Sequence, residues 1–75
     1  MSKFNGHKNW NHWNVSLWIN NDEGLYRMAL DMCRYRRRAE AARAMLAALE
    51  DMGITHTPDG APYSISSIKG AMVWM

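Results

Sequence analysis

Apolar residues recur at intervals of three and four along most of the chain. This spacing places side chains on one face of an α-helix. Four such segments follow one another, at residues 9–19, 22–35, 38–52 and 64–74. The pattern therefore predicts an all-α fold, a small bundle of three to four helices whose last segment packs across a middle antiparallel pair.

The first segment is rich in tryptophan. Its apolar positions share one helical stripe: Trp10, Trp13, Leu17 and Trp18. Asn9 is a suitable N-cap, because its side chain can accept from a free backbone N–H. A strand over residues 13–19 is the alternative, but three consecutive apolar residues at 17–19 break the alternation that a strand requires. We predict a helix whose tryptophans fill the core. The alternative is that the tryptophan stripe is an exposed binding surface, since tryptophan is enriched where interfaces concentrate binding energy.

The second and third segments carry clearer stripes. In the second segment, which Asp22 can cap, the stripe comprises Leu25, Met28, Ala29 and Met32, flanked by Cys33. In the third it comprises Ala42, Met45, Leu46, Leu49 and Met52, and Gly53 is a typical residue to end a helix. An arginine-rich run at residues 34–38 interrupts the apolar pattern. Two separate helices and one long bent helix both fit.

The C-terminal part begins with a turn. Residues 55–62 contain Pro58, Asp59 and Gly60 in succession, which is a typical turn sequence. The apolar positions that follow suit a short helix: Ile65, Ile68 and Met72. Any of three serines could cap it: Ser64, Ser66 or Ser67. Gly70 weakens the helix, so an extended tail packed on the bundle is the alternative.

The length of 75 residues allows one domain. We expect a single helical domain over residues 1–75, with residues 1–8 as a flexible N-terminus. Apolar residues make up 48% of the chain and include four Trp and seven Met, enough for a core. A homodimer that shares part of this core is also possible.

The N-terminal residues lack the apolar stretch of a signal peptide. No apolar run approaches the roughly 20 residues that span a bilayer. Cys33 is the only cysteine, so an internal disulfide is excluded. These features predict a reducing cytosol and no association with a membrane.

Candidate catalytic and metal-binding residues are few. Cys33 and the three histidines have no spacing typical of a metal site: His7, His12 and His56. No motif joins a nucleophile to a base, and no glycine-rich loop suits a phosphate. We therefore predict no enzyme activity, no metal and no cofactor.

The arginine-rich run is the strongest charge feature, although the net charge is only +2. It can be a solvated helix junction, a contact for an acidic protein surface, or a phosphate-binding patch on which Tyr35 stacks against a base. The residues predicted to bind a partner are Arg27, Arg34, Tyr35, Arg36, Arg37, Arg38, Arg43 and Trp74.

Two strings carry a family resemblance. The first runs from Trp-Asn-Val-Ser-Leu-Trp-Ile at residues 13–19 into Asn-Asn-Asp-Glu-Gly-Leu-Tyr at residues 20–26. The second is Gly-Ile-Thr-His-Thr-Pro-Asp-Gly at residues 53–60. Both resemble small proteins of bacteriophages and prophages whose function is unknown. That family continues with a more acidic tail, whereas residues 63–75 are apolar and carry no charge except Lys69.

The resemblance implies a phage or prophage origin and a location in the host cytoplasm, but it transfers no catalytic residues. We therefore predict a small phage protein that binds and inhibits or modulates a host protein, such as an anti-defence, anti-CRISPR-like inhibitor. The alternatives are a nucleic-acid-binding module that uses residues 34–38 and a structural homo-oligomer of the phage.

Overall fold

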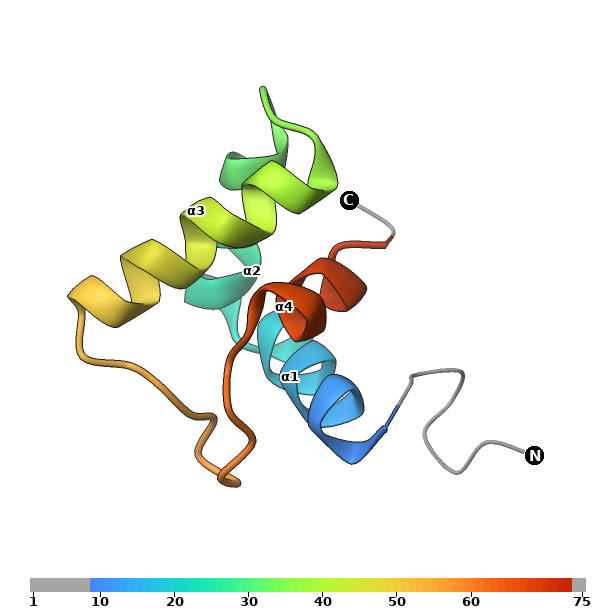
Figure 1. The fold of residues 1–75 in the computed structure, drawn as a ribbon, viewed down its shortest axis with the longest axis vertical. Coiled ribbons are helices and arrows are strands. Elements are labelled where there is room, and N and C mark those ends of the chain that lie inside the picture. Colours follow the sequence, from blue (N-terminus) through green and yellow to red (C-terminus); the bar gives the residue numbers. More distant parts are fainter. Residues whose placement is uncertain (1–8, 74–75) are drawn as a thin grey trace.

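The chain folds as four helices in the computed structural model, which describes residues 9–73 (Figure 1). They are α1 (Trp10–Asn21), α2 (Glu23–Cys33), α3 (Arg38–Asp51) and α4 (Ile65–Ala71). Within the described residues there is no strand, only an isolated bridge between His56 and Pro62. The prediction of a small all-α bundle is confirmed.

The helices pack in a closed ring around one core. Helix α1 contacts α2 and α4, and α3 contacts the same two helices. The last helix thus lies between α1 and α3 (Figure 1). The largest fully buried apolar side chains come from α1, α3, α4 and the residue after α4: Val15, Ile19, Met45, Leu49, Ile68 and Met72.

Helix α1 confirms the helical prediction and its N-cap, but not the predicted buried face. The Asn9 side chain accepts from the His12 N–H at 3.0 Å. The buried face is formed by Asn14, Val15 and Ile19. By contrast, Trp10 and Leu17 are 40% and 39% exposed, and Trp13 and Trp18 are partly exposed.

The prediction that the tryptophan stripe fills the core is therefore wrong. Residues two positions apart point about 200° from each other around a helix, so a face that buries Val15 turns Trp13 and Leu17 away. On α4, Ser66 and Gly70 lie against His12 of α1. Because these residues are small, α1 can approach α4 closely, whereas a tryptophan at this contact would hold the two helices apart.

Helices α2 and α3 are separate. The Asp22 side chain caps α2 by accepting from the Leu25 N–H at 3.0 Å. The helix ends at Cys33, two residues before the predicted end, and the Arg34 N–H donates to the Asp31 carbonyl in a tighter turn. Arg37 is then extended, with φ −67° and ψ 157°, which stops the helical path before α3 begins.

Helix α3 buries Ala41, Ala42, Met45 and Leu49. The predicted burial of Met52 is wrong: its side chain is 53% exposed, because it caps the C-terminus of α3 beyond the last buried turn. Gly53 follows with φ 77°, the left-handed conformation expected of a residue that ends a helix.

The short helix predicted near the C-terminus is confirmed as α4, and the extended alternative does not apply to residues 65–71. Ser64 and Ser67 cap its start reciprocally, each side chain accepting from the other residue's backbone N–H. Ile68 and Met72 are buried as predicted, whereas Ile65 is 37% exposed. Residues 1–8 and Trp74 lie outside the described residues. No helix in the described part is long and apolar enough to cross a membrane.

Candidate functional site

The turn between α2 and α3 presents the predicted arginine cluster to solvent. This arginine turn comprises residues 34–38, all of which are exposed. Tyr35 is 88% exposed, the largest exposure among the large apolar and aromatic side chains of residues 9–73. An aromatic ring so free of its own protein contributes almost nothing to the core, and it is available to a partner.

Few contacts neutralise the arginine turn. Arg36 donates to the Met32 carbonyl at 3.4 Å, and Arg38 donates to the Val73 carbonyl at 3.3 Å. Both acceptors are neutral backbone groups. In residues 9–73 the one ion pair joins Arg27 to Glu23 at 2.6 Å, outside the turn and on the exposed surface of α2. Ion pairs within this part of the chain therefore do not balance the charge of the turn.

The structure thus brings four of the six predicted arginines together: Arg34, Arg36, Arg37 and Arg38. Arg27 precedes Arg34 by seven residues, about 10 Å along a helix, although both border one shallow depression on α2. Arg43 is exposed on α3, five residues beyond Arg38. Trp74, the remaining predicted site residue, lies outside the described part.

A small cavity of about 140 Å³ lies behind the arginine turn. It is bordered by Cys33, Arg36, Arg38 and Met72. Burial raises the pKa of the Cys33 thiol, and the nearby Arg38 charge lowers it by a smaller amount. The thiol is therefore mostly protonated near neutral pH, which is the unreactive form.

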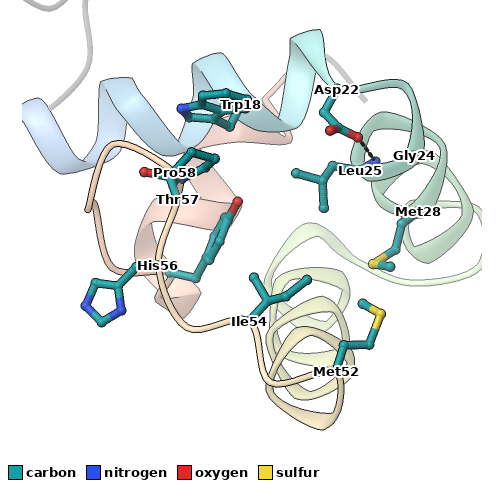
Figure 2. Close-up of a pocket in the computed structure, with 11 residues that line it drawn as sticks. Trp18, Asp22, Gly24, Leu25, Met28, Met52, Ile54, His56, Thr57 and Pro58 are labelled. Atoms are coloured by element: carbon teal, nitrogen blue, oxygen red, sulfur yellow. Dashed lines mark hydrogen bonds between the residues drawn. The ribbon is translucent and has the colours of Figure 1, made fainter.

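A second feature, at the other end of α2 and α3, is an open groove of about 560 Å³ (Figure 2). This apolar groove is lined by Trp18, Asp22, Gly24, Leu25, Met28, Met52, Ile54, His56, Thr57, Pro58 and Tyr63. Figure 2 shows Leu25 and Met28 on one side and His56 and Pro58 on the other. Its volume is within the range of small-molecule and peptide sites.

Hydrogen bonds between two residues of α1, Asn14 and Trp18, and two loop residues, Thr57 and Asp59, hold the loop side of the apolar groove against α1. We call these four side chains the clamp. The carboxylate of Asp59 accepts from Asn14 Nδ2 at 2.8 Å and from Trp18 Nε1 at 2.9 Å. The hydroxyl of Thr57 donates to Asn14 Oδ1 at 2.6 Å and accepts from the Ala61 N–H at 3.0 Å. Asn14 is 1% exposed and Thr57 is 4% exposed, so the bond between them is shielded from water.

The clamp and the turn geometry fix the loop that carries the wall. Gly60 has φ 96°, a conformation that glycine adopts readily and other residues rarely do. It closes the turn predicted from Pro58, Asp59 and Gly60, with the Gly60 N–H donating to the Thr57 carbonyl at 2.9 Å. Residues 54–63 therefore form a positioned wall of the groove, although they contain no helix.

Two ionisable groups beside the apolar groove have shifted pKa values, Asp59 and Tyr63. The hydrogen bonds from Asn14 and then Trp18 hold the pKa of Asp59 below its ordinary value. Burial raises the pKa of the Tyr63 hydroxyl, and the negative charge of Asp22 raises it further. The negative charge of Asp22 therefore acts on Tyr63, another residue that lines the groove.

The sequence pattern did not predict the apolar groove, yet it contained a signal for it. The two strings that carry the phage resemblance, residues 13–26 and 53–60, supply eight of the eleven lining residues. Asn14 could have drawn attention too, as a polar residue flanked by apolar ones within the helical segment. The apolar periodicity gave no reason to place residues 53–60 beside α1.

Metal-ligating side chains form no candidate site in the described part of the chain. No group of three or more His, Cys, Asp or Glu residues there lies close enough to hold a metal ion. His12 Nε2 lies 3.2 Å from Ser66 Oγ at an exposed position between α1 and α4.

Comparison with curated proteins and with solved structures found no match. One family matches over the full length, residues 1–75, and its description is "Family of unknown function (DUF7249)". The chain belongs to this family, DUF7249.

Proposed function

We propose that this protein acts by binding another protein, and that the arginine turn contacts an acidic surface of that partner. The observation that carries the proposal is the exposure of Tyr35 among four arginines that form no ion pair within residues 9–73. Arginine and tyrosine are enriched where interfaces concentrate binding energy. Arginine also recognises carboxylates through two parallel hydrogen bonds, which gives specificity as well as charge.

The resemblance to small phage and prophage proteins supports a narrower form of the proposal. In that form the partner is a host protein, and binding inhibits or modulates it, as an anti-defence or anti-CRISPR-like inhibitor does. A small folded domain with an exposed basic turn can occupy an acidic surface and block access to it. No chemistry at the turn is needed for such an effect.

The test compares two variants that each reverse one positive charge, in different places. Arg37→Glu reverses one charge in the turn, whereas Lys69→Glu reverses one exposed cation outside it, on α4. Each tagged protein is expressed in a bacterial host, and co-purifying proteins are quantified by mass spectrometry after nuclease treatment. We expect the wild-type chain and the control to enrich the same host protein, and the turn variant to lose at least about tenfold of it. Equal enrichment by both variants, or none by the wild type, contradicts the proposal.

Nucleic-acid binding is a second candidate, supported by the exposed Tyr35 ring between guanidinium groups. Bases stack on such rings while arginines contact phosphates. This function predicts affinity for single-stranded DNA or RNA that falls steeply as salt increases, because phosphate contacts release counterions. A gel-shift assay at low salt that shows no retardation excludes it.

A further inference from the structure

The apolar groove offers a second binding surface, distinct from the arginine turn. Carbon and sulfur atoms of Leu25, Met28, Met52 and Ile54 line much of it (Figure 2). The side chains of Trp18 and Tyr63 line it as well. Met52 is 53% exposed although it caps a helix beside the core. An apolar surface that is concave and open to water is typical of a recognition site.

The groove is also rigid on the side that carries no helix. The Thr57 and Asp59 hydrogen bonds to Asn14 and Trp18 fix the loop wall against α1. The opposite side is the first half of α2, whose start is capped by Asp22. A preformed groove avoids the cost of ordering its walls when a partner binds.

The charges around the groove are mostly negative. Asp22 is the one carboxylate among the lining residues, which include His56 but no lysine or arginine. Two exposed acidic residues that form no ion pair within residues 9–73 sit next in sequence to lining residues: Asp51 and Asp59. Among the described lysines and arginines only Arg27 does so, beside Met28, and it is paired with Glu23. The other described basic residues lie on the arginine turn, α3 and α4.

We propose that the apolar groove binds a short basic amphipathic segment of a partner protein, one that presents an apolar side chain beside a lysine or arginine. The apolar side chain enters between Leu25 and Ile54. The cation lies near Asp22, where the carboxylate attracts it and the neighbouring aromatic side chains can contact it. Lysine and arginine suit such a place because their stems are apolar and their heads remain in water.

The first experiment finds what the groove selects without knowing the partner. A random library of phage-displayed dodecapeptides is panned against the immobilised full chain at low salt. We expect the recovered peptides to combine a large apolar residue with an adjacent lysine or arginine. Recovery of acidic peptides, of apolar peptides without a cation, or of none overturns the proposal.

The second experiment locates the binding. The best recovered peptide is titrated into two variants that each exchange a half-exposed apolar residue for lysine, Met52→Lys in the groove and Leu30→Lys on α2 outside it. We expect at least about a tenfold loss of affinity for Met52→Lys, because it replaces an apolar lining side chain with a cation that repels the peptide's own, and little change for Leu30→Lys. Equal losses in the two variants overturn the proposed location.

Two further variants isolate the contribution of the Asp22 charge and keep this site apart from the arginine turn. Asp22→Asn keeps a good helix cap and should weaken the peptide by about three- to fivefold at low salt, less at high salt. Arg36→Ala/Arg37→Ala should leave peptide affinity unchanged, so this site is tested independently of the proposed function.

If the chain instead dimerises with rising concentration and Met52→Lys prevents it, the occupant is a second copy and the proposal of a foreign segment is wrong.

Discussion

The two connections that flank α3 are held in opposite ways. The arginine turn before it is fixed by backbone geometry and by weak contacts to two carbonyls, and all its side chains face solvent. The loop of residues 54–63 after it is fixed by side chains, because Thr57 and Asp59 reach across to α1. The side chains of the first connection therefore face solvent, whereas the second connection forms one side of the apolar groove.

This difference has an energetic basis. A buried polar group that loses its partner costs about 1–3 kcal/mol, whereas an exposed side chain exchanges its partner for water at little cost. Substitutions in the arginine turn should therefore affect binding and leave folding intact. Substitutions in the clamp should affect folding first.

The largest expected effect comes from removing the centre of the clamp. Asn14→Ala leaves the Thr57 hydroxyl without its acceptor, leaves the Asp59 carboxylate with the Trp18 N–H alone, and opens a small cavity. We expect a loss of about 2–3 kcal/mol in the free energy of unfolding, measured by urea denaturation. Hydrogen exchange of residues 54–63 should accelerate more than that of α3.

Asn20→Ala is the matched control. Asn20 is an exposed residue of the same helix whose side chain donates to the Ser16 carbonyl. We expect its unfolding free energy to stay within about 0.5 kcal/mol of the wild type. If Asn14→Ala costs no more than Asn20→Ala, the clamp does not hold the loop.

The helices were predictable from the sequence because their signals are local. The N-caps Asn9 and Asp22, the stop at Gly53 and the stripe through Met45 and Leu49 each act within a few residues. The bundle follows from them, because four amphipathic segments this short bury their stripes only against each other.

The buried face of α1 and the apolar groove were not predictable in the same way. Four large apolar residues on one side of α1 outweighed Val15 and Ile19 in the pattern, but the packing of α1 against α2 and α4 decides which side is buried. The clamp joins residues more than 40 positions apart, and apolar periodicity carries no information on such a pair. The exposure of the arginine turn, by contrast, followed from its composition.

A second prediction concerns the pH dependence of the clamp. The pKa of Asp59 is lower in the folded chain than its ordinary value of 3.8. Stabilisation by this carboxylate is therefore fully present above about pH 3.8 and is lost as the pH falls through the lowered pKa. We expect Asp59→Asn to reduce the slope of unfolding free energy against pH below 3.8.

Asp51→Asn serves as the comparison, because Asp51 is an exposed carboxylate at the end of α3 with no hydrogen bond to the clamp. Both variants lose one negative charge, so their difference reports on the Asp59 hydrogen bonds alone. The unfolding free energy of each variant is measured by urea denaturation as the pH is lowered. If it falls equally in the two variants, the hydrogen bonds from Asn14 and Trp18 do not couple folding to the ionisation of Asp59.

The smallest effect on stability is expected in the arginine turn. Arg36→Ala/Arg37→Ala removes two exposed side chains, of which only Arg36 makes a hydrogen bond within the described residues, and a long one. We expect the unfolding free energy to change by less than about 0.5 kcal/mol, because both residues are exposed. Repulsion among the four neighbouring guanidinium groups also falls, so a slight gain that disappears at high salt is consistent with this account. A loss above about 1 kcal/mol in urea denaturation would show that the turn holds α2 and α3 together and does not merely display its side chains.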